Sequence, residues 1–202
     1  LVEARLFYRL GEQETTIYGY PTISRMSGTV MTEFEIRTRG AAFIPSGVEI
    51  GYYYVFRDSR GERFESRRFR VEYLDPQYDW QHLDAGGFEL VWHDRRKEVV
   101  EAAAREVSRG LLPIIEVLGP LNSHPKRAVI VNNRREANRA FPLVSQAATD
   151  GQLYGGFAYP DYDLFILSGL SVDAMLHEMT HLLLDDAVES PSARVPAWLN
   201  EG

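Results

Sequence analysis

The sequence contains no cysteine among its 202 residues. This absence excludes disulfide bonds, cysteine-based zinc sites and a cysteine nucleophile. Any transition-metal site must therefore be built from histidine and carboxylate side chains. The chain also has no recognisable signal peptide and begins with Leu1. We expect a processed or trimmed product of an extracytoplasmic or secreted bacterial protein.

An excess of positive charge is missing as well. The formal net charge is -7 and the isoelectric point is about 5.3, which argues against nucleic acid as a partner because such proteins present a basic face. No apolar run approaches the roughly 18 residues of a membrane-spanning helix. We therefore expect no nucleic-acid partner and no membrane span in this sequence.

The composition is that of a globular protein, with 45% hydrophobic and 25% charged residues. Residues 2–10 alternate apolar and mostly polar side chains, which is the period of a half-buried strand. Several further short strands follow, separated by turn residues such as Asp58 and Gly61. This pattern predicts an antiparallel β-sandwich over residues 1–76, with the boundary near the stretch DPQYD at 75–79.

Residues 77–202 show a different pattern, in which strands and helices are mixed, so the fold class expected for the whole chain is α+β. Strands are predicted at 87–93 and 127–131, and one or two more within 157–167. A long helix follows the first of these. Asp94 is a candidate cap for its start, and Pro113 should kink it or end its first segment.

The last clear element is a helix at about residues 171–187, which carries the stretch LHEMTH and has Ser171 as its cap. Its apolar residues follow helical spacing and form one stripe: Val172, Met175, Leu176, Met179, Leu182 and Leu183. His177 and His181 are four residues apart, so both imidazoles can point at one ion. Glu178 is rotated by about 100° from His177 and can flank that ion without binding it.

Two neutral imidazoles beside one carboxylate are what a zinc hydrolase needs in order to activate water. The alternative is an ordinary solvated helix face with two unrelated histidines. On composition alone, the order H-E-x-x-H arises in roughly one such chain in a hundred, and here it lies on a predicted helix. The pattern therefore favours metal binding.

A catalytic zinc usually takes three protein ligands. The metzincin class is excluded, because Leu184 and Ala187 occupy the positions where it needs glycine and histidine. The remaining candidates are Asp185, Asp186, Glu189 and Glu201. Glu201 is favoured because it follows His181 by 20 residues, across a loop and at the start of a new helix, PAWLNEG. Its alternative role is that of a first-turn glutamate stabilised by the helix dipole.

The pair LHEMTHLLL and PAWLNEG resembles the motifs of the gluzincin metallopeptidases, in particular peptidase-MA-like domains whose second motif reads W-L-x-E-G. It is also similar to thermolysin-type sites. The resemblance is specific over residues 171–202 and only general over 78–170. It implies a zinc-dependent peptidase domain at 77–202, acting on a peptide or protein substrate. In that family an edge strand pairs with the substrate backbone, and residues 162–167 or 155–160 are the candidates here.

The resemblance also implies roles for individual residues. It makes His177, His181 and Glu201 the zinc ligands and Glu178 the general base. Asn200 matches an asparagine that supports a ligand histidine. Because such a histidine needs an acceptor for its second ring N–H, Asp185 is an alternative in that role.

The family usually places a tyrosine or histidine after the third ligand to stabilise the oxyanion, and no such residue follows Glu201 here. Tyr154, Tyr159 and Tyr162 lie upstream, and ordinary buried or edge-strand positions would explain all three equally well. We expect that the gene product is longer than this chain, and that these 202 residues bind zinc weakly or not at all.

The function expected is hydrolysis of peptide bonds by a metal-activated water with a glutamate base. The rival is a non-catalytic binding or structural protein that retains the gluzincin-like domain. The aromatic run Tyr52-Tyr53-Tyr54 is a candidate carbohydrate-binding face, although strands favour aromatic residues in any case.

Overall fold

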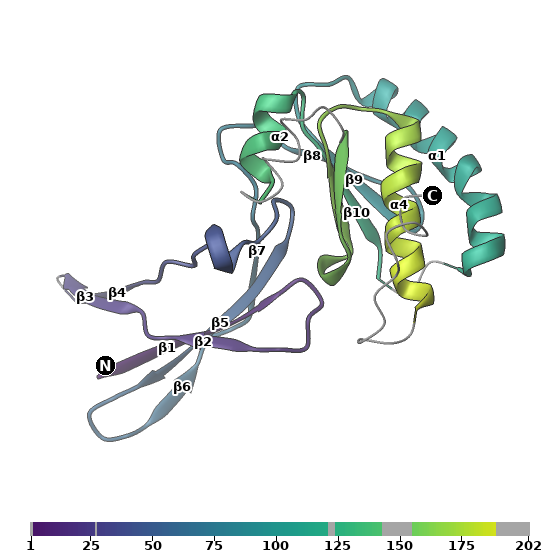
Figure 1. Cartoon of the computed structure of the whole chain (residues 1–202). Coiled ribbons are helices and arrows are strands. Elements are labelled where there is room, and N and C mark those ends of the chain that lie inside the picture. Colours follow the sequence, from purple (N-terminus) through teal and green to yellow (C-terminus); the bar gives the residue numbers. More distant parts are fainter. Residues whose placement is uncertain (1, 27, 121–123, 143–154, 189–202) are drawn as a thin grey trace. The chain divides into compact units, whose positions relative to one another are not determined.

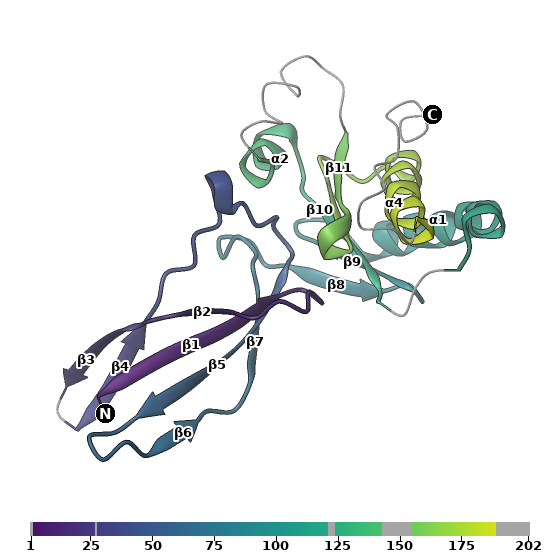
Figure 2. The same cartoon turned by 60° about the horizontal axis from the view of Figure 1, so that its bottom comes forward.

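The computed structural model describes residues 2–26, 28–120, 124–142 and 155–188. The chain divides into two compact units (Figures 1 and 2). The first unit comprises residues Leu1–Ile44 and Val48–Tyr73, and the second comprises Pro45–Gly47 and Leu74–Gly202. Strands and helices are both abundant, which confirms the expected α+β class at this level.

The first unit is built from antiparallel strands. Its five-stranded sheet has the order β2-β1-β5-β6, and β7 also pairs with β5. These strands are β1 (Glu3–Leu10), β2 (Ile17–Gly19), β5 (Glu49–Arg57), β6 (Arg63–Glu65) and β7 (Phe69–Glu72). A separate hairpin consists of β3 (Thr22–Met26) and β4 (Thr29–Glu33), and a single 3-10 turn, η1 (Gly40–Ala42), follows.

The antiparallel character of this unit is as predicted, and Ala4, Leu6 and Leu10 are buried along β1 as their alternation indicates. The described strands, however, form sheets of five and two strands rather than the two comparable layers typical of a sandwich. The reason lies in the pairing of β5. This strand is nine residues long, so it accommodates β1 along one side and both β6 and β7 along the other.

The second unit contains a mixed five-stranded sheet of order β11-β12-β10-β9-β8. Its strands are β8 (Gln81–Asp84), β9 (Phe88–Trp92), β10 (Lys126–Ile130), β11 (Gly156–Tyr159) and β12 (Leu164–Leu167). The three central strands run parallel, and β8 and β11 are antiparallel to their neighbours. The strands expected at 87–93 and 127–131 are confirmed, and 157–167 holds two strands joined by η2 (Pro160–Tyr162).

Two helices pack together and against the sheet of this unit. They are α1 (Lys97–Leu118) and α4 (Val172–Ala187), and a shorter helix, α2 (Arg134–Ala140), follows β10. Alternate residues of the central strands, including Leu90, Ala128 and Phe165, join the apolar stripes of α1 and α4 in one core. Hydrophobic burial on this scale is the main source of stability for such a layer.

The expected cap of the long helix is wrong, and so is one of the two effects expected of Pro113, the end of a first helical segment. Asp94 does not cap it: α1 begins at Lys97, and Asp94 instead adopts a left-handed conformation beside His93. Pro113 does not end it either, because the helix continues to Leu118. Both Pro113 and Arg109 are exposed. Water can therefore satisfy the Arg109 carbonyl that loses its partner when proline removes an N–H.

Within the described part of the chain, no helix combines the length and the apolar composition that a membrane crossing requires.

Candidate metal site and its surroundings

The helix α4 begins as the sequence predicts. Ser171 has extended backbone angles, and its hydroxyl accepts a hydrogen bond from the Ala174 N–H at 3.3 Å. The apolar stripe turns toward the core, where Met175, Met179 and Leu182 are almost fully buried. This packing fixes the rotation of the helix about its axis. It leaves His177 exposed, on a different face from the stripe.

The two histidines of α4 converge. The Nε2 atoms of His177 and His181 lie 3.0 Å apart, and the ring planes are perpendicular, with centroids separated by 4.5 Å. Two nitrogens bound to one tetrahedral zinc at about 2.0–2.1 Å would lie about 3.3 Å apart. The observed separation is close to that value. These two side chains therefore fit a shared metal ion with only a small adjustment.

Glu178 lies in the same helical turn as His177, but its side chain is buried, with 5% of its surface exposed. Its carboxylate lies directly against β11 at Gly156. A Cβ atom added to Gly156 would stand 2.8 Å from Glu178 Oε1 and 2.5 Å from a methyl group of Leu167. Only glycine leaves room for the carboxylate at this position. The structure thus places a buried carboxylate between α4 and the sheet, on the residue that follows His177 in the helix.

Tyr159, at the end of β11, belongs to the same surroundings. Its pKa is raised, first by burial of the phenol and second by the negative charge of Glu178. Both causes disfavour the phenolate, so the side chain remains a neutral hydrogen-bond donor near the carboxylate at all ordinary pH values. Of the three upstream tyrosines considered from the sequence, Tyr162 lies in η2 and Tyr154 lies outside the described residues.

The strand beside this site is at the edge of its sheet. In the described part of the second unit β11 pairs only with β12, whereas β12 lies between β11 and β10. Of the two candidates for a substrate-pairing edge, residues 155–160 therefore have the required position and residues 162–167 do not. Figure 2 shows β11 next to the α4 side of the sheet.

Asp185 lies near other charged residues of the second unit and does not bind the histidines. It is mostly exposed, and in the described part of the chain it makes no hydrogen bond to His177 or His181. Its pKa is raised by partial burial and then by the nearby charges of Asp161 and Asp186.

Asp163 and Asp186 flank Lys126, whose side chain is completely buried at the start of β10. Its Nζ atom contacts Asp163 in the β11–β12 connection and lies 2.7 Å from an oxygen of Asp186 near the end of α4. A buried ammonium group is tolerated only when it is paired in this way. Lys126 therefore ties the C-terminal end of α4 to the β11–β12 hairpin. Nothing in the spacing of the sequence indicated this role.

A second buried polar cluster surrounds His93, for which no ligand spacing was found in the sequence. Its two ring nitrogens lie 2.9 Å from Asp94 and 3.1 Å from Glu136, and its ring stacks on Tyr78 at 4.0 Å between centroids. Because both nitrogens face carboxylates on opposite sides of the ring, this arrangement is a hydrogen-bonded structural cluster and not a metal site.

Glu201 and Asn200, the expected third ligand and its supporting neighbour, lie outside the described residues. Their roles stay predictions. Comparison with protein-family models, with curated proteins and with solved structures gives no match for this chain. The functional interpretation therefore depends on the geometry around α4 and on the motifs of the sequence.

Proposed function

We propose that the second unit is a zinc-dependent peptidase of the gluzincin type. The observation that supports this most strongly is the convergence of the His177 and His181 Nε2 atoms on the helix that also carries the buried carboxylate of Glu178. Glu201 is the proposed third ligand, with Asn200 as the acceptor for a histidine N–H. A peptide or protein is the proposed substrate, in an extracytoplasmic or secreted setting.

In the proposed reaction the edge of β11 pairs with an extended substrate backbone and holds the scissile bond in place. Zinc bound by the two histidines would polarise the carbonyl and lower the pKa of water. Glu178 takes the proton of the attacking water and passes it to the leaving amine. Its burial against Gly156 keeps the carboxylate in one orientation and limits its contact with solvent. Tyr159 is a neutral donor within the electrostatic reach of that carboxylate.

The proposal is tested by Glu178→Gln in this chain. The amide cannot accept the proton, so hydrolysis of a broad peptide library should fall by at least about 100-fold, the lower range for general-base catalysis. Zinc binding, measured by isothermal titration calorimetry, should be unchanged because Glu178 is not a ligand. Asp173→Asn, an exposed acid in the first turn of the same helix, is the matched control.

The second candidate is a binding or structural protein that retains the domain without catalysis. It gains support if the wild-type chain binds zinc at a 1:1 ratio and hydrolyses no peptide of the library. It also predicts that Glu178→Gln changes no measured function.

A further inference from the structure

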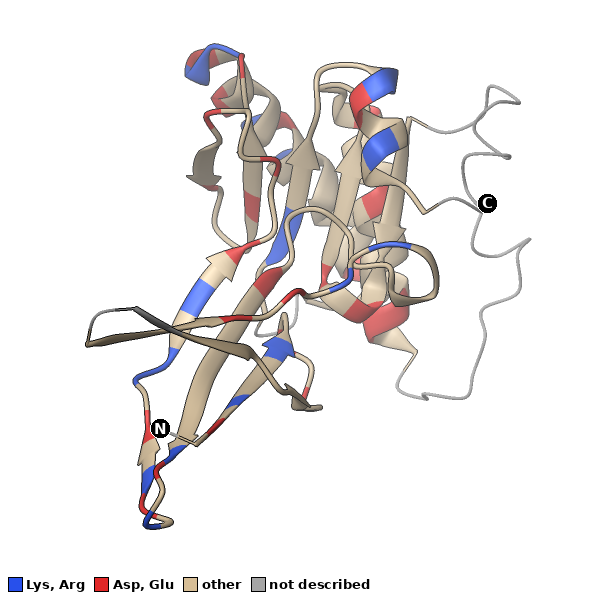
Figure 3. Cartoon of the chain, turned by 90° about the vertical axis from the view of Figure 1, so that its left-hand side faces the viewer, with Lys and Arg blue, Asp and Glu red and all other residues tan. Residues whose placement is uncertain are grey.

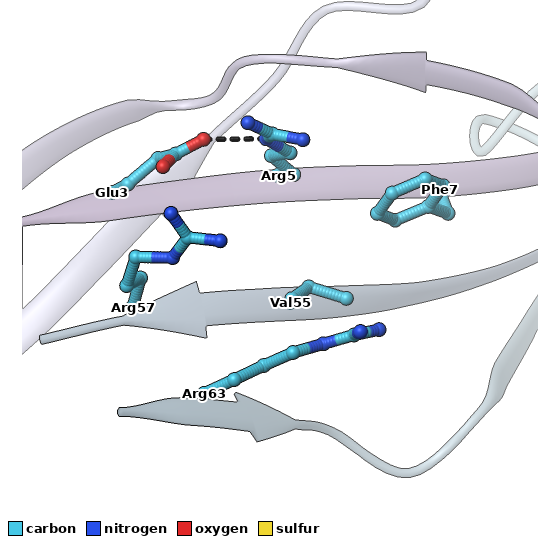
Figure 4. A pocket seen from close by; sticks show the side chains of 6 residues that line it. All are labelled: Glu3, Arg5, Phe7, Val55, Arg57 and Arg63. Atoms are coloured by element: carbon cyan, nitrogen blue, oxygen red, sulfur yellow. Dashed lines mark hydrogen bonds and ion pairs between the residues drawn. The ribbon is translucent and has the colours of Figure 1, made fainter. Parts of the chain in front are cut away.

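The sheet of the first unit carries three arginines that line one pocket. In the strand register Glu3 lies opposite Arg57, and Arg57 lies opposite Arg63, so these residues form one row across β1, β5 and β6. Arg5 is two residues from Glu3 and shares its face of β1. The pocket is lined by Glu3, Arg5, Phe7, Val55, Arg57 and Arg63 (Figure 4).

The positive charges in this pocket are only partly balanced. Glu3 pairs with Arg5, and Arg63 is 3.4 Å from Glu65. Among the described residues, Arg57 makes no ion pair or hydrogen bond through its side chain, and Figure 4 shows its guanidinium below the Glu3–Arg5 pair. Like charges directly opposite each other on neighbouring strands are destabilising. An anion between Arg57 and Arg63 would remove that repulsion.

All the positively charged side chains of the first unit are arginines. Residues 1–44 and 48–73 contain eleven arginines, no lysine and ten acidic residues, a net charge of +1, whereas the remaining residues carry -8. Figure 3 shows basic and acidic segments interspersed along the strands of this unit. Arginine binds carboxylates through two parallel hydrogen bonds, which lysine cannot do.

The strand that carries Arg63 is also an open edge. In the described part of the first unit, β6 is the last strand of its sheet and pairs only with β5. Backbone hydrogen bonds join residue 62 to 58 and residue 66 to 54. Because bonded pairs alternate in an antiparallel ladder, the backbone groups of Arg63 and Glu65 point away from β5. They are available to an added strand.

We propose that β6 and the arginine pocket bind an extended acidic peptide. The peptide pairs with the outer edge of β6 at the usual 4.7–4.9 Å between strands. A glutamate opposite Arg63 then projects onto the face that holds Arg57 and Arg5, and its carboxylate enters the pocket. The open backbone edge favours a peptide over an acidic polysaccharide or free phosphate, since neither of these can continue a β-sheet. This site lies in the first unit and depends on neither zinc nor hydrolysis.

The test uses the whole chain and a capped, fluorescent decapeptide of alternating Glu and Thr, with binding followed by fluorescence anisotropy. Arg57→Gln and Arg63→Gln should each weaken binding about tenfold, the effect of losing one charge-assisted pair. Arg60→Gln, an exposed arginine in the β5–β6 turn, should change it less than twofold. A peptide with Gln in place of Glu should bind at least tenfold more weakly.

Two further measurements separate this site from general charge attraction. A peptide N-methylated on its β6-facing amides should lose binding, because it cannot pair with the edge. Arg63→Glu should bind the Glu peptide more weakly and a Lys-Thr decapeptide more tightly. Because an unfolded variant could not gain affinity for the second peptide, this result also shows that the variant is folded.

The proposal is overturned if no binding is found up to millimolar peptide, or if Arg60→Gln weakens it as much as the pocket variants do. Equal affinity of the N-methylated peptide would rule out strand pairing. Oligogalacturonate or inorganic phosphate binding as tightly as the Glu peptide, with the same arginine dependence, would instead make this a general anion pocket.

Discussion

At the scale of single residues, Glu178 of α4 interacts with several neighbours at once. Glu178 is buried, touches the backbone of Gly156 and influences the pKa of Tyr159. The motif predicted that this glutamate flanks a metal. It could not predict the burial, because that depends on a strand 22 residues earlier in the sequence.

Tyr159 should make the protein less stable at high pH. Its pKa is raised in the folded state, so above about pH 10 the unfolded chain loses this proton while the folded chain keeps it. Fewer protons are then bound in the unfolded state, and stability falls as pH rises, by at most about 1.4 kcal/mol per pH unit. Tyr159→Phe should flatten urea-measured stability against pH above 10. The exposed Tyr20 provides the control, and an equal effect of Tyr20→Phe would contradict the prediction.

Lys126→Met should destabilise the second unit strongly. The change leaves Asp163 and Asp186 facing each other at the end of α4 without their cation. Losing one partner of a buried ion pair costs about 3 kcal/mol or more, and the partial exposure of both carboxylates places this case at the lower end. Chemical denaturation measures the loss. Lys97, the only other lysine in the sequence, is exposed, and Lys97→Met should cost less than about 0.5 kcal/mol.

At the scale of elements, the helix and strand assignments that follow from hydrophobic period are mostly confirmed. α4, β9 and β10 lie where the patterns place them, because α4 has one buried stripe at helical spacing and the two strands are short apolar runs buried almost throughout. β8 was missed, since its four residues are mostly exposed and carry no apolar run. Asp94 does not cap α1, and Pro113 does not end a first segment of it, because the pairing of a neighbouring histidine and the exposure of a helix turn are decided by tertiary contacts.

The packing of α4 on β11 gives a matched pair of glycine variants. Gly156→Ala places a methyl group within 3 Å of Glu178, so it should displace the carboxylate and reduce both stability and the proposed hydrolysis. A cost of about 1–3 kcal/mol is expected for such overpacking. At Gly155 the nearest atom to an added Cβ is Ala174 Cβ, at 4.0 Å, which is an ordinary contact.

Gly155→Ala should therefore change neither stability nor activity measurably. Thermal unfolding and peptide cleavage of both variants provide the comparison. If the two variants behave alike, the close approach of β11 to α4 is not what holds Glu178.

At the scale of the whole molecule, each unit has buried apolar residues of its own, and all three tryptophans lie in the second. Tryptophan fluorescence therefore reports unfolding of the second unit alone, whereas circular dichroism reports both. Zinc at 100 times its dissociation constant should stabilise the fluorescence-detected transition by about 2.7 kcal/mol. The transition of the first unit should not move. A zinc-induced shift of both transitions would show that the units unfold together.

The sequence by itself determined the α+β class, the position and capping of α4, and the two histidines one turn apart, because these depend on local period and spacing. Tertiary structure decided the rest. The burial of Glu178, the edge position of β11 and the Lys126 cluster bring together residues from separate elements. The pocket of Arg5, Arg57 and Arg63 likewise exists only once three strands pair in register. Such neighbours follow from strand order and helix rotation, which no short stretch of sequence specifies.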